Sequence, residues 1–135
     1  MAYKIEDLEG IGPKIGETLR GAGITTVEAL LSSAASGTGR KELAAKTGLS
    51  EKNLLQWANL ADLCRIKGIS TQYSQLLEAA GVDTVKELAT RNAPNLTQKL
   101  REINESKKLV RVAPAENTVA DWIAQAKTLP AMITH

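Results

Sequence analysis

The chain has 135 residues, 43% of them hydrophobic and 24% charged, a balance typical of a folded globular protein rather than a disordered one. Aromatic residues make up only 3%, and phenylalanine is absent, which disfavours a β-sheet fold because strands are enriched in aromatic and β-branched residues. The net charge of +2 is too small to indicate nucleic-acid binding by itself. A single histidine and a single cysteine exclude an ordinary zinc site and leave little scope for histidine-based catalysis.

The number of cysteines and the hydropathy of the chain predict its cellular compartment. Cys64 is the only cysteine and cannot form an internal disulfide, which fits a reducing compartment. It follows a helical run of Leu and Ala, so we expect a buried, inert thiol. No apolar run approaches the roughly 20 residues of a membrane-spanning helix. We therefore expect a cytoplasmic protein without membrane contact.

The sequence repeats itself at an offset of 58 residues, which places Gly10 on Gly68. At this offset the segment Ala22–Leu30 falls on Ala80–Leu88, and apolar positions coincide along both. Trp57 and Trp122 correspond at a longer offset of 65. Since self-similarity at a fixed offset indicates repeated structural units, we predict two copies of one helical unit, residues 1–62 and 63–135, the second more divergent. The expected architecture is all-α, with both copies packed as one compact pseudo-symmetric domain.

The first copy is expected to contain short helices joined by glycine turns. A short helix containing Ile5 and Leu8 ends at Gly10, and Pro13 begins a helix that Gly23 ends. The spacing of Thr25 and Glu28 predicts a capping box that opens a helix through Leu31. The small, polar residues 32–39 are typical of a loop. A helix over 40–47 follows, and Ser50 caps a longer helix that carries Trp57.

The second copy is expected to follow the same order. Ser70 caps its first long helix, Gly81 ends it, and Thr84 with Glu87 opens the next. Pro114 is predicted to begin the final helix, with Trp122 on its apolar stripe. Because both tryptophans lie on apolar stripes, we expect them to anchor the core rather than to stack on bases.

The turn Gly10-Ile11-Gly12 carries the clearest chemical signal. The glycines permit positive φ and leave no side chain in the way of an approaching phosphate. Ile11 is expected to anchor the turn in the core, while the helix that begins at Pro13 presents free N–H groups, which favour an anion. Lys14 adds a positive charge beside them. The alternative is a purely structural turn, favoured by the acidic neighbours Glu6, Asp7, Glu9 and Glu17, which would repel a phosphate.

This segment resembles the helix-hairpin-helix motif, and the tandem arrangement resembles the bacterial family of the domain of unknown function 4332. The resemblance to the helix-hairpin-helix motif implies a sequence-independent contact with the phosphate backbone through Gly10, Ile11, Gly12 and Lys14. The resemblance to the family implies the fold. The second copy keeps Gly68 and Ile69, but Ser70 replaces the second glycine and Thr71 and Gln72 stand where Pro13 and Lys14 stood. Lys67 restores one charge on the other side of that turn. Lys67 and Gly68 are the candidates for a second phosphate contact, and the replacement of the second glycine, the proline and the lysine is the argument against it.

Positive charge gathers in the second copy, where residues 91–112 hold six basic side chains against two acidic ones. We select Lys107, Lys108 and Arg111 as candidates for a nucleic-acid contact, with a solvated face as the alternative. The predicted function is a small, non-catalytic module that binds DNA non-specifically without cofactor or metal. The alternative is a protein-protein interaction adaptor that keeps the hairpin scaffold without DNA binding. The sequence leaves the protein partner and the oligomeric state open.

Overall fold

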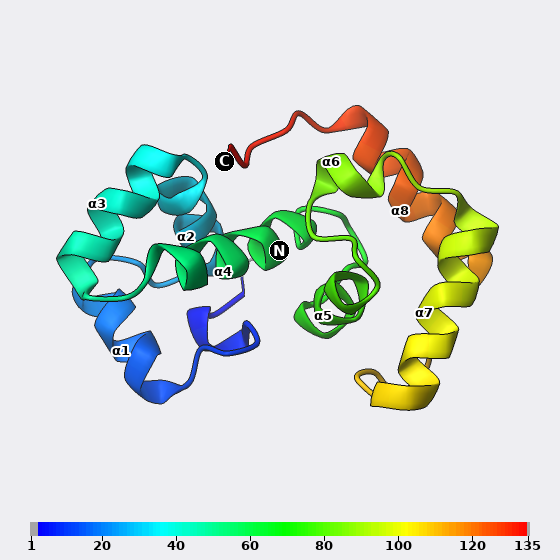
Figure 1. The fold of residues 1–135 in the computed structure, drawn as a ribbon, viewed down its shortest axis with the longest axis horizontal. Helices are drawn as coiled ribbons and strands as arrows, with labels where there is room; N and C mark the ends of the chain where they lie inside the picture. Colours follow the sequence, from blue (N-terminus) through cyan, green and yellow to red (C-terminus); the bar gives the residue numbers. More distant parts are fainter. Residues whose placement is uncertain (1–2, 135) are drawn as a thin grey trace. The chain divides into compact units, whose positions relative to one another are not determined.

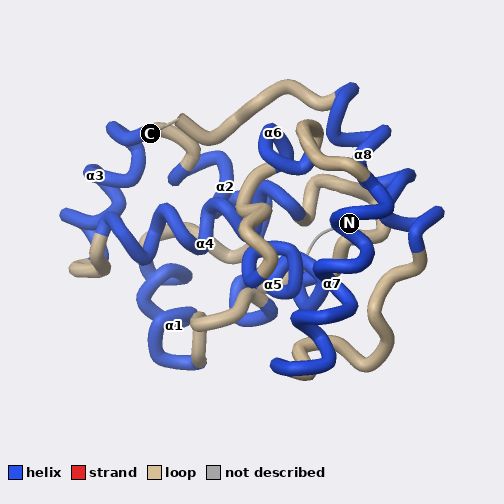
Figure 2. The backbone as a smooth tube through the Cα atoms, turned by 45° about the vertical axis from the view of Figure 1, so that its right-hand side comes forward, coloured by secondary structure: helices blue, strands red, loops and turns tan. Residues whose placement is uncertain are grey.

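A computed structural model describes residues 3–134, and within them the protein is all-α, as predicted. Eight α-helices and one 3-10 helix account for the regular structure of this part of the chain (Figure 2). The extended backbone there is limited to an isolated antiparallel bridge between Lys4 and Thr26. No helix in the described part is both long and apolar enough to cross a membrane.

The chain divides into two compact units, each described by itself. Unit 1 comprises residues 1–62 and 132–135, and unit 2 comprises residues 63–131. The first boundary coincides with the predicted repeat boundary. Residues 132–134 lie with unit 1 in this division. The repeat bounds 1–62 and 63–135 stay a prediction. Thr134 donates its N–H to the carbonyl of Ala35 at 2.8 Å, and the buried Arg40 donates from Nη2 to the carbonyl of Thr134.

Unit 1 is built from short helices whose apolar faces meet in one core. Its elements are η1 (Ile5–Asp7), α1 (Pro13–Gly21), α2 (Val27–Ala34), α3 (Gly37–Thr47) and α4 (Glu51–Leu63), which ends at the boundary (Figure 1). Ile5, Leu19, Leu30 and Leu54 are fully buried. Trp57 is also in the core, with 4% of its surface exposed, as predicted.

Unit 2 contains α5 (Thr71–Ala79), α6 (Val85–Leu88), α7 (Ala93–Lys107) and α8 (Glu116–Thr128). Helices α7 and α8 lie side by side, and α5 packs against α7 (Figure 1). One hydrophobic cluster joins all four helices, with Leu77, Leu88, Leu100 and Trp122 among its members. The ring of the half-buried Tyr73 lies against that of Trp122, with centroids 5.3 Å apart.

Several predicted element boundaries are wrong. Residues 32–39 are not a loop: α2 continues to Ala34 and α3 begins at Gly37, capped by the Ser36 hydroxyl. The expected helix ending at Gly10 is only the 3-10 turn η1. The cap of α2 is Thr26, one residue after the predicted Thr25. The last helix begins at Glu116 rather than at Pro114. Cys64 is half-buried rather than buried.

The two units have matching turns at the predicted offset of 58. Helix α1 begins at residue 13 and ends at 21, and α5 begins at 71 and ends at 79. Gly23 and Gly81 follow them with φ of 87° and 90°. Thr26 and Thr84 then cap the next helices through their side-chain oxygens. These agreements support an internal duplication, which stays a prediction.

Candidate functional site

The predicted anion-binding turn lies between η1 and α1, and most of it faces solvent. Gly10 is exposed and has a φ of +88°, a conformation that side chains other than glycine rarely adopt. Ile11 is 4% exposed and anchors the turn in the core, as predicted. Gly12 is the exposed N-cap residue of α1, where a side chain at that position would meet no other atom within 4 Å.

Helix α1 begins without a side-chain cap from the described residues. Its first intrahelical hydrogen bond runs from the N–H of Gly16 to the carbonyl of Gly12, at 2.9 Å. The preceding N–H groups of Lys14 and Ile15 thus have no intrahelical acceptor, and Pro13 has no N–H. The Lys14 side chain is exposed beside them. This helix end combines free donors, the positive end of the helix dipole and a lysine.

Trp57 lies directly under the turn. A Cβ atom at position 10 would be 3.1 Å from Nε1 of Trp57, a tight contact that favours glycine here in addition to the positive φ. The sequence pattern indicated a buried tryptophan on α4 but could not show that its nitrogen would lie at Gly10. No pattern in the sequence predicts that residues 10 and 57 lie close together.

Two of the acidic residues near the turn have their own partners. Arg20 donates from Nε and Nη2 to the Glu6 carboxylate, at 3.0 and 2.5 Å. This hydrogen-bonded pair lowers the pKa of Glu6 and raises that of Arg20. Asp7 accepts the backbone N–H of Lys4 at 3.1 Å. Glu9 and Glu17 are exposed. The pairing of Glu6 reduces the negative potential that argued against an anion at this turn.

The second turn has the same backbone but is closed by side chains. Gly68 has a φ of +100°, and a Cβ there would lie 3.1 Å from Nε1 of Trp122. The Ser70 hydroxyl accepts the N–H of Tyr73 at 3.3 Å, which satisfies a donor that remains free in α1. The Gln125 amide accepts the N–H of Lys67 at 2.9 Å and donates to its carbonyl at 3.0 Å. Gln125 lies 58 residues after Lys67 in the chain, and no local sequence pattern predicts that the two meet.

The structure brings two of the predicted basic residues next to α5. Lys108 and Arg111 line an open hollow of about 720 Å³ together with Gln72, in the first turn of α5. Lys108 follows the last residue of α7 and has a left-handed backbone, with φ of 51°. Lys107 is exposed at the end of α7 and does not line this hollow. Unit 2 thus holds an open hollow with two basic side chains in its lining.

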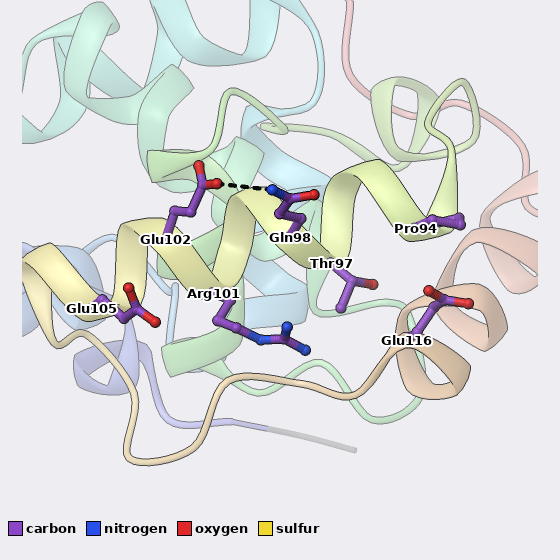
Figure 3. Close-up of a pocket in the computed structure, with 7 residues that line it drawn as sticks. All are labelled: Pro94, Thr97, Gln98, Arg101, Glu102, Glu105 and Glu116. Carbon is purple, nitrogen blue, oxygen red and sulfur yellow. Dashed lines mark hydrogen bonds between the residues drawn. The ribbon is translucent and has the colours of Figure 1, made fainter.

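Another hollow, of about 420 Å³, lies over α7 and the start of α8 (Figure 3). Basic and acidic side chains line it, and in Figure 3 Arg101 extends between Glu105 and Glu116. Glu102 accepts a hydrogen bond from Gln98 at 3.2 Å. It contains none of the predicted binding residues. Within residues 3–134, no group of three or more histidine, cysteine or acidic side chains could hold a metal ion.

The comparisons with known proteins find one family. A family model described as a domain of unknown function, DUF4332, matches residues 9–129. No curated protein and no solved structure matches the chain.

Proposed function

Because the chain belongs to the DUF4332 family, whose description assigns no activity, we propose a function from the geometry: a small, non-catalytic module that binds the phosphate backbone of nucleic acid. The observation that carries this proposal is the uncapped start of α1 beside the exposed Gly10 turn. Free N–H groups at a helix start favour a phosphate oxygen, and Lys14 adds a mobile positive charge. Such contacts do not read base sequence.

Unit 2 supports the proposal with a second set of cations. Its own glycine turn offers fewer free donors, since the Ser70 and Gln125 side chains accept hydrogen bonds from the backbone N–H groups of Tyr73 and Lys67. The Lys108 and Arg111 side chains beside Gln72 supply positive charge at the start of α5 instead. In this proposal unit 1 holds a phosphate mainly through backbone donors, whereas unit 2 attracts the polyanion through side chains. Lys67 and Gly68 are then structural, and Lys107 contributes only long-range attraction.

Fluorescence anisotropy with a labelled short DNA duplex tests this function at several salt concentrations. Wild type is compared with Lys14→Glu and with the control Lys46→Glu, which makes the same charge change on an exposed residue of α3 in the same unit. We expect Lys14→Glu to weaken binding far more than Lys46→Glu. The slope of log affinity against log salt should become shallower by about 0.9 for each lost phosphate contact.

The possible outcomes distinguish a specific phosphate contact at α1 from a general effect of net charge on DNA binding. Equal loss in both variants would mean that only net charge matters, and the proposed site at α1 would be wrong. A Lys108→Glu/Arg111→Glu double variant that alone abolishes binding would move the contact to unit 2. If the wild-type protein does not bind the duplex even at low salt, nucleic-acid binding is excluded. Protein partners for the adaptor function then become the next candidates.

A further inference from the structure

The indole of Trp57 places a polar group at the candidate site. Trp57 is 4% exposed, yet its Nε1 lies 3.1 Å from the position where a Cβ atom of the exposed Gly10 would be. Among residues 3–134, no side chain or carbonyl accepts a hydrogen bond from this nitrogen. The fully buried side-chain atom without a partner in this part of the chain is Oδ1 of Asn59, so the Trp57 nitrogen is not fully buried. The indole N–H therefore belongs to a core residue but is accessible to a ligand at the glycine turn.

Such an arrangement is unusual for a buried tryptophan. The indole nitrogen is a donor only, and buried Trp N–H groups normally find an acceptor. The same turn leads into α1, where the N–H groups of Lys14 and Ile15 have no intrahelical acceptor and the Lys14 side chain is exposed. Donors gathered without an acceptor are complementary to an anion with several oxygens.

We propose that Nε1–H of Trp57 is a ligand-binding donor that hydrogen-bonds a phosphodiester oxygen held at the Gly10–Lys14 turn. This inference rests on the proposed function and assigns one side chain of α4 to the same site. Glycine at position 10 then has a binding role as well as a conformational one, since any side chain there would cover the indole nitrogen. The rigid ring needs no reordering when the phosphate arrives, which lowers the entropic cost of binding.

Trp122 provides a matched internal comparison. Its Nε1 lies at the same 3.1 Å from the Cβ position of Gly68. The start of α5 beside it is capped, however, because the Ser70 hydroxyl accepts a hydrogen bond from the N–H of Tyr73. The uncharged Gln72 occupies the position equivalent to Lys14 of unit 1. We therefore expect Trp122 not to donate to a phosphate.

The test is a ¹H–¹⁵N correlation spectrum of the unsubstituted 135-residue chain during titration with a short DNA duplex. The chain has two tryptophans and so gives two indole N–H signals, which Trp57→Phe and Trp122→Phe assign. We expect the Trp57 signal to move downfield in proportion to the bound fraction, while the Trp122 signal stays in place. In anisotropy titrations Trp57→Phe should bind about fivefold more weakly, as for one lost hydrogen bond, and Trp122→Phe as wild type.

The wild-type titration is informative even if a Phe variant folds poorly, since it needs no substitution at the donor. If the duplex binds and Lys14→Glu weakens it, but the Trp57 signal does not move, the Trp57 inference is wrong while the proposed function stands. Equal movement of both indole signals would also overturn it, because the closed turn of unit 2 would then respond as well. If the duplex does not bind at all, the proposed function itself fails.

Discussion

Arg20 on α1 pairs with both carboxylate oxygens of Glu6 on η1, at 3.0 and 2.5 Å. The pair joins the two sides of the glycine turn and gives one of its acidic neighbours a counter-charge. Glu6 also lies against Gly16, where a Cβ would be 2.6 Å from the Glu6 Oε2 atom. The lack of a side chain at position 16 therefore allows the pair to form close to α1.

This pair predicts a pH dependence. The Arg20 hydrogen bond lowers the pKa of Glu6 below its ordinary value of 4.5. Because the folded-state pKa is below that of the unfolded chain, the pair stabilises the fold above pH 4.5, and this contribution is lost as the pH falls through the lower value. In Arg20→Gln, the pKa of Glu6 should rise toward 4.5, as measured by carboxyl ¹³C shifts in a pH titration. An unchanged Glu6 titration would show that the pair does not persist in solution.

Two helix glycines should respond differently to alanine. In Gly39→Ala the new Cβ would lie 2.2 Å from the backbone carbonyl oxygen of Ser33, so we expect a loss of about 1–3 kcal/mol in unfolding free energy. In Gly16→Ala the obstacle is the Glu6 side chain, which can turn away at the cost of its exposed ion pair with Arg20. The gain in helix propensity of about 1 kcal/mol offsets that cost. Urea denaturation compares the two variants. Equal losses would contradict the assigned contacts.

Arg40 is expected to hold the C-terminal segment on unit 1. Its buried guanidinium donates to the carbonyls of Ala34 and Ala35, at 2.9 and 3.0 Å, and to that of Thr134. Arg40→Met should destabilise the protein by about 2 kcal/mol, because the buried carbonyl of Ala34 and the partly buried carbonyls of Ala35 and Thr134 lose their donor. The amide of Thr134, bonded to Ala35, should also exchange hydrogen faster. The exposed neighbour Lys41→Met is the control, and faster exchange there as well would refute a specific role of Arg40.

Lys108 is the one residue other than glycine with positive φ in the described part of the chain. A lysine in this conformation is strained, so Lys108→Gly should stabilise the protein by about 0.5–1 kcal/mol while removing a cation from the hollow beside Gln72. Lys99→Gly, at an exposed position inside α7, removes the same charge but should destabilise by about 1 kcal/mol. Denaturant midpoints measure both. A destabilised Lys108→Gly would show that the strain is absent in solution.

The helix starts and ends were predictable wherever a local signal was strong. Ser70 and Thr84 cap helices as expected, because their hydroxyls bond backbone N–H groups three residues ahead. Gly23 and Gly81 end helices since glycine adopts positive φ easily. The prediction failed over residues 32–39, where small, polar residues suggested a loop. Helices α2 and α3 form there because they pack on each other and Arg40 satisfies the carbonyls at the end of α2.

The order of residues alone established the helical class, the matching glycine turns and the burial of Ile11 and Trp57, because these follow from local propensity and periodicity. Only the tertiary structure decided which groups meet at those turns. It placed the Trp57 nitrogen at Gly10, paired Glu6 with Arg20, and closed the second turn with Gln125. Contacts between residues distant in sequence depend on how helices pack, and that packing is set by the combined shape of many side chains rather than by any local pattern.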